Sequence, residues 1–428
     1  MNIGFAKEKI DLYKCNDKNI YLAGFAQKRE ATGKYDDIFV KCIALKFEDK
    51  IYLFFNYDLC AVDELIINKL LDNLAEIKID KNNVFITSTH THSSYAGVVN
   101  TDDGFLAVAK EIFGKTDAKL IDYICKVSFD CANKAIKDIQ PAKVKYNNGI
   151  CKSFGSNRNN KNLAGNDRLF IVEIEQKIKK IAIINFACHP TILNYTNTKI
   201  SGDFPGYLEK IFNDNNFEFC MFLNGSCGDI STRFTKQGNG YDEVIRMTKK
   251  LYDSSIVALE NAKEANLKTM KINNVNCYLK AKTKPTIEDA EKFLKLCERE
   301  YDQGIKNGIC GSELRLLENH IEGAQANVRY AISTYNPTEI EVNIKILNIN
   351  DQYFVFIPGE CFSELGNIIE NSKRHIISYA NGYKMYFADS KAYDDQVYEA
   401  MSSPFEKGEC EKMISKIDEM IKCMEDKK

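Results

Sequence analysis

The stretch from Arg168 to Cys188, RLFIVEIEQKIKKIAIINFAC, decides the fold. Two runs rich in Ile, Val and Phe flank a short polar turn, a pattern typical of two buried strands joined as an antiparallel pair. An antiparallel pair next to strands of other orientation gives a mixed sheet. The stretch therefore predicts a mixed sheet rather than a purely parallel one.

Similar apolar runs recur on both sides of this stretch, and amphipathic segments lie between several of them. The alternation predicts a layered α/β fold with mixed β-sheets flanked by helices. The expected strands are 39–47, 50–59, 83–89, 218–226, 339–349 and 352–360, and the expected helices include 63–77 and 119–139. In the first of these helices, Leu65, Ile66, Leu70, Leu71 and Leu74 recur at helical spacing.

At about 285–333 the alternation of strands and helices gives way to charged helical sequence, which predicts a helical excursion from the sheets. Two charged helical runs there flank the glycine-containing KNGICGS (306–312), which predicts a hairpin packed on the main body or a separate lid. A charged C-terminal helix is expected at about 405–426. Because no linker rich in Pro, Gly or Ser divides the chain, residues 1–428 are expected to form a single catalytic domain.

Composition excludes several classes of protein. The chain of 428 residues is 44% hydrophobic and 28% charged, which indicates a globular fold, and its net charge of −2 excludes the basic field that nucleic acid requires. No run approaches the ~20 apolar residues of a membrane span, and the N-terminal MNIGFAKEKIDLYKC lacks the pattern of a secretory signal. The 15 cysteines are scattered without a C-x-x-C pair, which is typical of reduced thiols. A cytoplasmic protein is expected.

Three of the five histidines lie where predicted strands end. His90 and His92 follow the strand at 83–89 with i, i+2 spacing, which on an extended chain places both rings on one face. His189 follows the strand that begins at Lys180, and Pro190 stops that strand. Imidazole is a preferred zinc ligand, so the three histidines indicate a metal site or, alternatively, satisfied structural histidines. His320 and His375 are expected on the surface.

Six segments, in order, resemble those of the neutral ceramidases, zinc enzymes that hydrolyse the amide of N-acylsphingosine. The order agrees over about residues 3 to 405, and the resemblance implies that family's catalytic-domain fold. The segments are THTHS (89–93), SNR (156–158), FACHPTILNYTNTKISGDFPG (186–206), NGSCGDIS (224–231), IPGE (357–360) and YANGYKMYFADSKAYDDQVYEAMSS (379–403).

The resemblance also implies a site with one Zn²⁺. Its ligands would be His90, His189, Glu360 and Tyr386. His92 and Arg158 would contact the substrate or the developing oxyanion, and Ser231 would lie beside the metal as an acid–base or nucleophilic group. Zinc in such a site polarises a carbonyl and activates water. A tyrosine titrates near ~10, so Tyr386 binds as phenolate only if the metal lowers its pKa.

Considered from the residues alone, several of these groups also have structural explanations. Ser231 lacks the G-x-S-x-G elbow and could cap a helix, and Arg158 could form a surface ion pair. Asp203 and Asp229 are expected to bond backbone amides around the site. The other tyrosines could be aromatic core: Tyr379, Tyr383, Tyr393 and Tyr398.

The chain departs from the family pattern at the rim of the expected site. Ser94, Tyr95 and Ala96 stand where the family has glycines and proline, and Thr232 and Arg233 stand where it has proline and asparagine. After Ser403 only the charged helix follows, so the family's C-terminal immunoglobulin-like domain is expected to be absent.

The sequence thus predicts a zinc-dependent amidase that hydrolyses a lipid amide, ceramide-like by resemblance, through metal-activated water. One alternative is a metal-dependent amidohydrolase for a soluble, non-lipid amide. A non-catalytic homologue that binds a metal or ligand is the alternative from another class.

Overall fold

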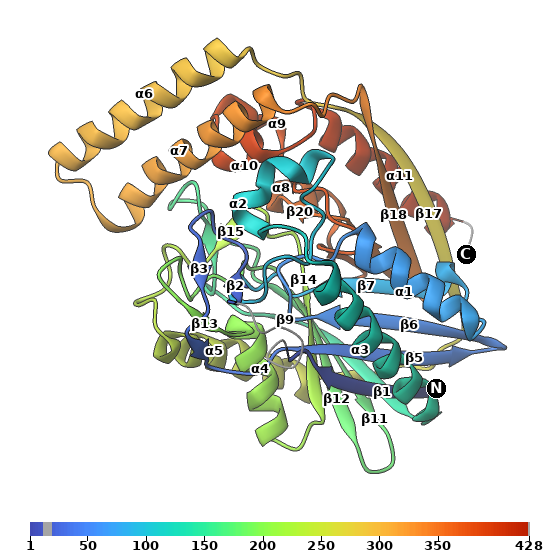
Figure 1. Cartoon of the computed structure of the whole chain (residues 1–428). Helices are drawn as coiled ribbons and strands as arrows, with labels where there is room; N and C mark the ends of the chain where they lie inside the picture. Colours follow the sequence, from blue (N-terminus) through green and yellow to red (C-terminus); the bar gives the residue numbers. More distant parts are fainter. Residues whose placement is uncertain (12–18, 427–428) are drawn as a thin grey trace.

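Three β-sheets carry the fold, and helices cover their outer faces (Figure 1). The computed structural model describes residues 1–11 and 19–426. The sheets combine parallel and antiparallel neighbours, so the predicted mixed α/β class is confirmed.

The first sheet has the strand order β7-β6-β5-β1-β8. Strands β1, β5 and β6 are antiparallel neighbours, whereas β7 runs parallel to β6. Helices α1 and α3 pack beside it, and aspartates cap both: Asp63 accepts from the amide of Leu65, and Asp117 from the amides of Lys119 and Leu120. The bounds are β1 (Asn2–Lys9), β5 (Phe39–Phe47), β6 (Lys50–Tyr57), β7 (Val84–Ser88), β8 (Gln140–Pro141), α1 (Glu64–Glu76) and α3 (Ala118–Lys137).

One expected member of the α1 apolar face points outward. Ile66, Ile67, Leu70 and Leu74 are buried, whereas Leu65 is exposed. The buried face of α1 therefore includes Ile67 in place of Leu65, which the sequence spacing had predicted.

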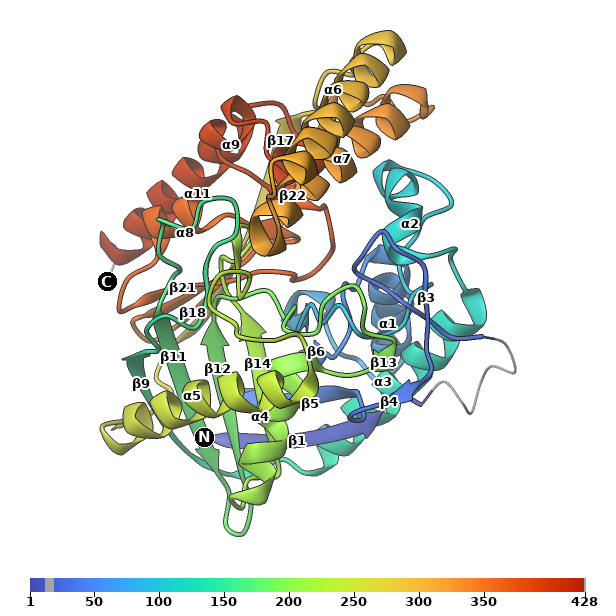
Figure 2. The ribbon, with the colours of Figure 1, turned by 90° about the vertical axis from the view of Figure 1, so that its left-hand side faces the viewer.

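The second sheet contains the stretch from which the sequence analysis began. Strands β11 and β12 form the predicted antiparallel pair, and β14 runs parallel to β12. Helices α4 and α5 cover its outer face (Figure 2). The bounds are β9 (Lys143–Ile150), β11 (Arg168–Glu175), β12 (Lys180–Phe186), β14 (Phe219–Asn224), β16 (Lys263–Glu264), α4 (Asp203–Asp214) and α5 (Tyr241–Glu260).

The third sheet has the order β17-β18-β19-β21 and packs against the C-terminal helix α11. That helix begins at Glu409, four residues later than the sequence predicted. The bounds are β17 (Met270–Lys280), β18 (Glu339–Ile349), β19 (Gln352–Phe356), β21 (Arg374–Ile377), α8 (Ser363–Ile369) and α11 (Glu409–Asp426).

The expectation that His375 lies on the surface is wrong. His375 is buried on β21, its ring centroid 4.1 Å from that of Phe170, and its Nε2 lies 3.1 Å from Oε1 of Gln352. The adjacent Arg374 suggested an exposed segment. In the structure that arginine is buried by ion pairs with α11, through Asp418 and Glu425.

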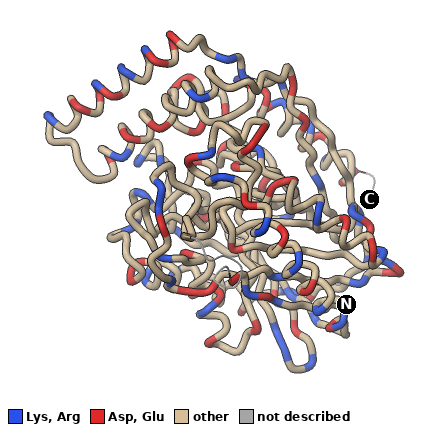
Figure 3. Tube along the Cα trace, in the orientation of Figure 1, with Lys and Arg blue, Asp and Glu red and all other residues tan. Residues whose placement is uncertain are grey.

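The helical excursion is a hairpin of α6 (Ile287–Lys306) and α7 (Gly311–Ile332), as predicted. It projects beyond the sheets at the upper left of Figure 1. Thr286 caps α6 by accepting from the amide of Asp289. Basic and acidic residues are interspersed along α6, without a surface of one sign (Figure 3).

Short elements connect these layers and form the loops above the sheets. Every cysteine that the structure describes is a free thiol, in agreement with the sequence; Cys15 lies outside the described residues. The remaining bounds are β2 (Tyr21–Leu22), β3 (Arg29–Glu30), β4 (Gly33–Lys34), β10 (Ser156–Asn157), β13 (Lys199–Ile200), β15 (Ile230–Ser231), β20 (Glu360–Cys361), β22 (Tyr386–Phe387), α2 (Lys110–Phe113), α9 (Ser390–Asp394), α10 (Tyr398–Ser402) and the 3₁₀ turns Lys81–Asn83 and Phe105–Ala109.

Candidate functional site

The loops that follow strands of all three sheets meet at one place. His90 comes two residues after the end of β7, His189 three residues after the end of β12, and Glu360 four residues after the end of β19. Strand β22 pairs in parallel with β20, so that Tyr386 lies opposite Glu360. The structure therefore brings together side chains that are far apart in the sequence.

Two imidazoles converge on one buried carboxylate. The Nε2 atom of His189 lies 2.9 Å from Oε2 of Glu360, and Nε2 of His90 lies 3.4 Å from the same oxygen. The Nε2 atom of His92 lies 3.1 Å from Nε2 of His90. All four side chains are buried.

The other ring nitrogens of the two histidines are anchored on backbone carbonyls. Nδ1 of His90 lies 2.6 Å from the carbonyl oxygen of Cys60, and Nδ1 of His189 lies 2.6 Å from that of Cys227. A carbonyl only accepts, so each Nδ1 carries the hydrogen, and in the neutral ring Nε2 offers its lone pair. Metal-binding histidines are commonly oriented in this way.

The backbone around this cluster is strained. His90, Asp203, Tyr379 and Met385 all have positive φ angles, of 67°, 54°, 55° and 59°. Non-glycine residues in this region cost about 1–3 kcal/mol each and concentrate at functional sites. The sequence argument expected His90 and His92 after the strand, on extended chain. The extended conformation is wrong for His90, whose φ of 67° is left-handed. The left-handed turn at His90 brings the two rings together instead.

Burial and mutual charge shift the pKa values of the cluster. Burial acts to raise the pKa of Glu360, but His90 and His189 hold it well below its usual range. Burial acts to lower the pKa of His90, yet Cys60 and Glu360 raise it to about 10. Burial lowers the pKa of His189 to about 4, and it holds that of His92 well below its usual value. The carboxylate is thus balanced by one positive charge at His90, the place where a bound cation would compete with the proton.

Tyrosines surround the carboxylate. The Tyr383 hydroxyl donates to Oε1 of Glu360 at 2.5 Å, the Tyr379 hydroxyl donates to Oε2 at 3.4 Å, and the Tyr379 ring stacks on His90 at 4.0 Å. Burial raises the pKa of both phenols, so they remain donors. From the sequence these two tyrosines were considered possible aromatic core. Both rings are indeed buried in the core, and their hydroxyls also orient Glu360.

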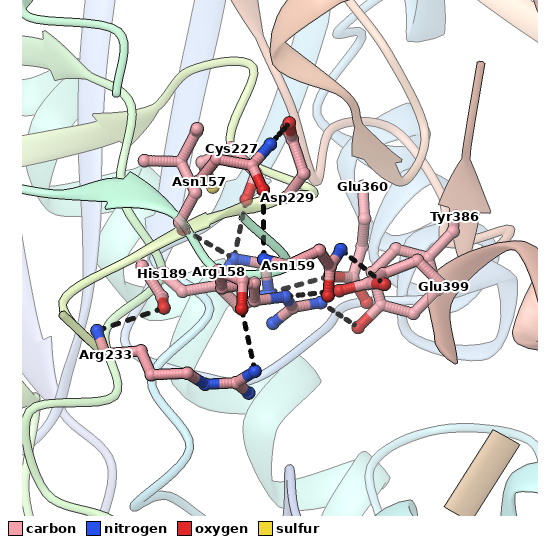
Figure 4. Close-up of polar contacts among 12 residues, drawn as sticks. Asn157, Arg158, Asn159, His189, Cys227, Asp229, Arg233, Glu360, Tyr386 and Glu399 are labelled. Atoms are coloured by element: carbon pink, nitrogen blue, oxygen red, sulfur yellow. Dashed lines mark hydrogen bonds and ion pairs between the residues drawn. The ribbon is translucent and has the colours of Figure 1, made fainter. Parts of the chain in front are cut away.

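Arg158 is buried at the centre of a polar network (Figure 4). Its Nε donates to Oε1 of Glu399 at 2.5 Å, and its Nη2 donates to the hydroxyl of Tyr386 at 3.0 Å. Burial raises the pKa of Tyr386 well above its usual value, although Arg158 acts against that rise. The alternative of a surface ion pair for Arg158 is excluded. Glu399 lies within the segment 379–403, and no local sequence pattern indicated that it pairs with Arg158.

Ser231 lies on β15, opposite Ser156, and is buried. Its hydroxyl accepts from the backbone amide of Arg233 at 3.3 Å, in a turn and not at the start of a helix. Among the described residues, no imidazole or carboxylate contacts this hydroxyl. Ser231 therefore lacks the base that activates a serine nucleophile.

The two aspartates make the expected structural bonds. Oδ2 of Asp203 accepts from the amide of Leu193, and Oδ1 of Asp229 accepts from the amide of Ser363. Asp229 also accepts from the side chain of Asn157, next to Arg158. These bonds connect the His189, Arg158 and Glu360 segments.

The opening above the cluster is a cavity of about 390 Å³, within the range of small-molecule sites. His92, Arg158, Ser231 and Tyr386 line it, and helix α7 forms one wall. Gly24 lies against the His92 ring: with φ of +100°, a Cβ there would be 2.4 Å from the ring. The α7 residues in the wall are Gly311, Ser312, Leu314, Arg315, Glu318, Asn319 and Glu322.

A second cavity, of about 180 Å³, lies among the three sheets. Aliphatic and aromatic side chains line almost all of it, including Ile43, Phe85, Met221 and Phe356. It is separate from the histidine cluster, and the phenol of Tyr146 is the titratable side chain among the described residues that line it. The polar cavity, in contrast, contains His92, Arg158 and Tyr386.

None of the helices among the described residues is both long and apolar enough to cross a bilayer. This agrees with the hydropathy of the sequence.

Comparison with known proteins agrees with the fold and the arrangement of segments. The family model described as "Neutral/alkaline non-lysosomal ceramidase, N-terminal" matches residues 16–232, just over half of the 428 residues. No curated protein matches the chain. The neutral ceramidase from Pseudomonas aeruginosa has a similar structure, with a TM-score of 0.76 and 18% identity, over 100% of this chain and 74% of that one. A structure described as "Ceramidase complexed with C2" matches with a TM-score of 0.75 and 16% identity, over 100% of this chain and 75% of that one. The chain belongs to the neutral/alkaline non-lysosomal ceramidase family, and is a hydrolase of that family.

Proposed function

We propose that this protein is a zinc-dependent hydrolase that cleaves the amide bond of an N-acyl compound, ceramide-like by its family. One observation carries the proposal: the Nε2 atoms of His90 and His189 converge on the Glu360 carboxylate, beside two residues that line a polar cavity, His92 and Tyr386. The family membership supplies the reaction class, and the cluster supplies the chemistry.

The proposed ligands of one Zn²⁺ are His90, His189, Glu360 and Tyr386. The donor set fits, because two imidazole lone pairs and a carboxylate oxygen lie within 4.8 Å of one another with their hydrogens directed away. Tyr386 lies beside Glu360 through the β20–β22 pair. When bound, zinc supplies a Lewis acid that polarises a carbonyl and lowers the pKa of water toward ~7.

The side chains around the proposed metal have separate tasks. Arg158 stays cationic against Glu399 and directs Nη2 toward the Tyr386 hydroxyl, where it can stabilise negative charge on the amide oxygen. His92 stays neutral because burial and the neighbouring imidazoles lower its pKa, so it serves as a hydrogen-bond donor to the substrate. The Ser231 hydroxyl is placed on the cavity wall to contact the amide or the leaving amine.

The test is metal content together with turnover. Purified wild-type protein is expected to hold about one zinc per chain by elemental analysis and to cleave an N-acyl amide. A His90→Ala, His189→Ala variant is expected to lose both. His320→Ala is the matched control, because His320 is partly exposed on α7 and outside the cluster. Unchanged zinc in the double variant would refute the metal site, and full zinc without cleavage of any amide would favour the non-catalytic alternative.

The soluble amide is the second candidate for the substrate. The observation that favours it is the charged wall of the cavity, which contains Arg233, Lys236, Arg315, Glu318 and Glu322. A site for aliphatic chains alone is expected to be mainly apolar.

A further inference from the structure

Two cations on the cavity wall have no carboxylate partner. Arg233 donates through Nη1 to the carbonyl oxygen of Arg158 at 2.9 Å, and Lys236 donates through Nζ to the carbonyls of Thr191 and Ile192, both at 2.9 Å. No carboxylate within the part of the chain that the structure describes lies in ion-pair distance of either one. Both side chains line the cavity together with Ser231 and Tyr386.

The other two cations of this wall are paired. Arg158 binds Glu399, and Arg315 binds both Glu318 and Glu322 from the same helix. The cavity therefore contrasts two arginines that form direct ion pairs with two cations whose side chains donate to backbone carbonyls. Carboxylates act on these two cations only from beyond ion-pair distance, Glu322 and Glu399 on Arg233, and Asp203 and Glu243 on Lys236.

Both side chains are partly buried, and a partly desolvated cation is stabilised when an anion binds it directly. Burial is the main cause that lowers the pKa of Arg233 to about 9 and that of Lys236 to about 8. Both side chains nevertheless remain mostly protonated at pH 7. An anionic ligand group at this wall would supply the direct ion-pair partner that both cations lack among the described residues.

We infer that the substrate carries a carboxylate close to its scissile amide and that Arg233 binds this carboxylate, with Lys236 adding positive potential. Arg233 is two residues from Ser231, and its guanidinium contacts the backbone of Arg158, so a group that it holds lies next to the proposed reaction centre. The inference rests on the proposed amide hydrolysis and narrows its substrate.

The rest of the cavity suits an acyl chain. Phe25, Tyr195, Leu314 and Tyr398 provide apolar surface there. An N-acyl amino acid combines an apolar chain, an amide and a nearby carboxylate. In its hydrolysis the carbonyl carbon gains a bond to the water oxygen and loses its bond to nitrogen, a water proton passes to the amine, and a fatty acid and an amino acid leave. A ceramide offers only uncharged hydroxyls to Arg233.

The experiment uses the zinc-loaded full chain and two matched amides, N-octanoylglycine and the uncharged N-octanoylglycinamide, beside a short-chain ceramide. We expect kcat/KM for the carboxylate substrate to exceed that for the glycinamide at least tenfold. In Arg233→Gln this ratio is expected to fall at least tenfold, and in Arg233→Lys by less. A ratio of rates within one variant is insensitive to partial loss of folded protein. Arg246→Gln is the matched control, because the exposed Arg246 side chain lies on α5, outside the cavity lining, where it pairs with the buried Glu243.

Binding gives a second readout that does not need turnover. N-octanoylglycine is expected to bind the wild type in calorimetry and to bind Arg233→Gln at least tenfold more weakly. If the glycinamide or the ceramide is the better substrate, or the ratio is the same in Arg233→Gln, the inference is overturned while the proposed hydrolase stands. If no amide is cleaved but N-octanoylglycine binds through Arg233, the proposed hydrolase fails and the carboxylate site stands.

Discussion

At the scale of single residues, the geometry of Arg158 makes it the most specific of the candidate catalytic groups. Its Nε donates to Glu399, and its Nη2 donates to the hydroxyl of Tyr386. Making both contacts at once requires several N–H donors in one plane, which a guanidinium provides. Lysine offers one charged point and cannot make both contacts in the same geometry.

We therefore expect Arg158→Lys to lower kcat by about 10²-fold, which corresponds to the ~3 kcal/mol typical of a lost oxyanion contact. Zinc content should be unchanged, since Arg158 is not a proposed ligand. The measurement is steady-state kinetics beside elemental analysis, with Arg246→Lys as the control. Full activity in Arg158→Lys would exclude a contact with the reacting amide.

His375 gives a prediction for the dependence of stability on pH. Burial lowers the pKa of its imidazole from 6.5 to about 3. Between these values the unfolded chain binds a proton that the native fold excludes, so the stabilising effect of the neutral ring is complete above pH 6.5 and is lost as the pH falls.

Between pH 7 and pH 4, the wild type should lose roughly 3 kcal/mol of unfolding free energy more than His375→Gln does. Urea unfolding at a series of pH values measures the difference between the two proteins. His320→Gln, with a partly exposed ring, is the comparison and should follow the wild-type profile. Parallel profiles for wild type and His375→Gln would show that the buried ring is protonated in the native fold.

At the scale of elements, a backbone contact joins the turn before β15 to strand β20. The amide of Gly228 donates to the carbonyl of Cys361 at 2.8 Å, and a Cβ at position 228 would lie 2.6 Å from the carbonyl oxygen of Glu360. Because the neighbouring atom is backbone, it cannot move aside as a side chain would.

Gly228→Ala should therefore displace Glu360 and weaken zinc binding at least tenfold, as measured by competition with a chelator. Gly238→Ala is the matched control, because a Cβ there approaches nothing closer than 3.8 Å. Equal affinities for zinc in the two variants would mean that β20 tolerates the shift.

The sequence predicted most of the elements, and the reason is local. The β11–β12 pair, the α6–α7 hairpin and helices α1 and α3 all follow from periodicity and turn residues within one segment. Periodicity does not report long-range pairing, so it could not place Glu360 beside His189, which is 171 residues away. That convergence, and the ligand set with it, was implied only by the family resemblance.

Other features of the site had no local signal. The left-handed turn at His90, the Tyr383 bond to Glu360 and the Glu399 partner of Arg158 depend on tertiary contacts. The surface assignment of His375 failed because ion pairs with a distant helix bury the charged residue beside it. The metal itself stays a prediction.

At the scale of the whole molecule, a buried ion triad joins the first sheet to a helix of the second. Lys41 on β5 binds Asp58 at 2.9 Å and Glu209 of α4 at 2.8 Å, and all three side chains are buried. Removing one partner of a buried group of charges typically costs about 3–5 kcal/mol, because the remaining charges lose their compensation.

Lys41→Met should therefore lower the free energy of unfolding by about 3–5 kcal/mol in urea titrations. Lys134→Met provides the comparison, since Lys134 pairs with Glu8 at the surface, where such a pair contributes under about 1 kcal/mol. A loss below about 1 kcal/mol in Lys41→Met would mean that the sheets are held together by apolar packing alone.

The spread of the proposed ligands along the chain also affects how the protein is made. The first, His90, and the last, Tyr386, are separated by most of the sequence, and the carboxylate between them is held in place by the β20–β22 pair. During translation no growing chain contains the full set until residue 386 has been added. A complete zinc site is therefore expected to form only after residue 386 has been made, so zinc should enter after synthesis of the ligand-bearing segments.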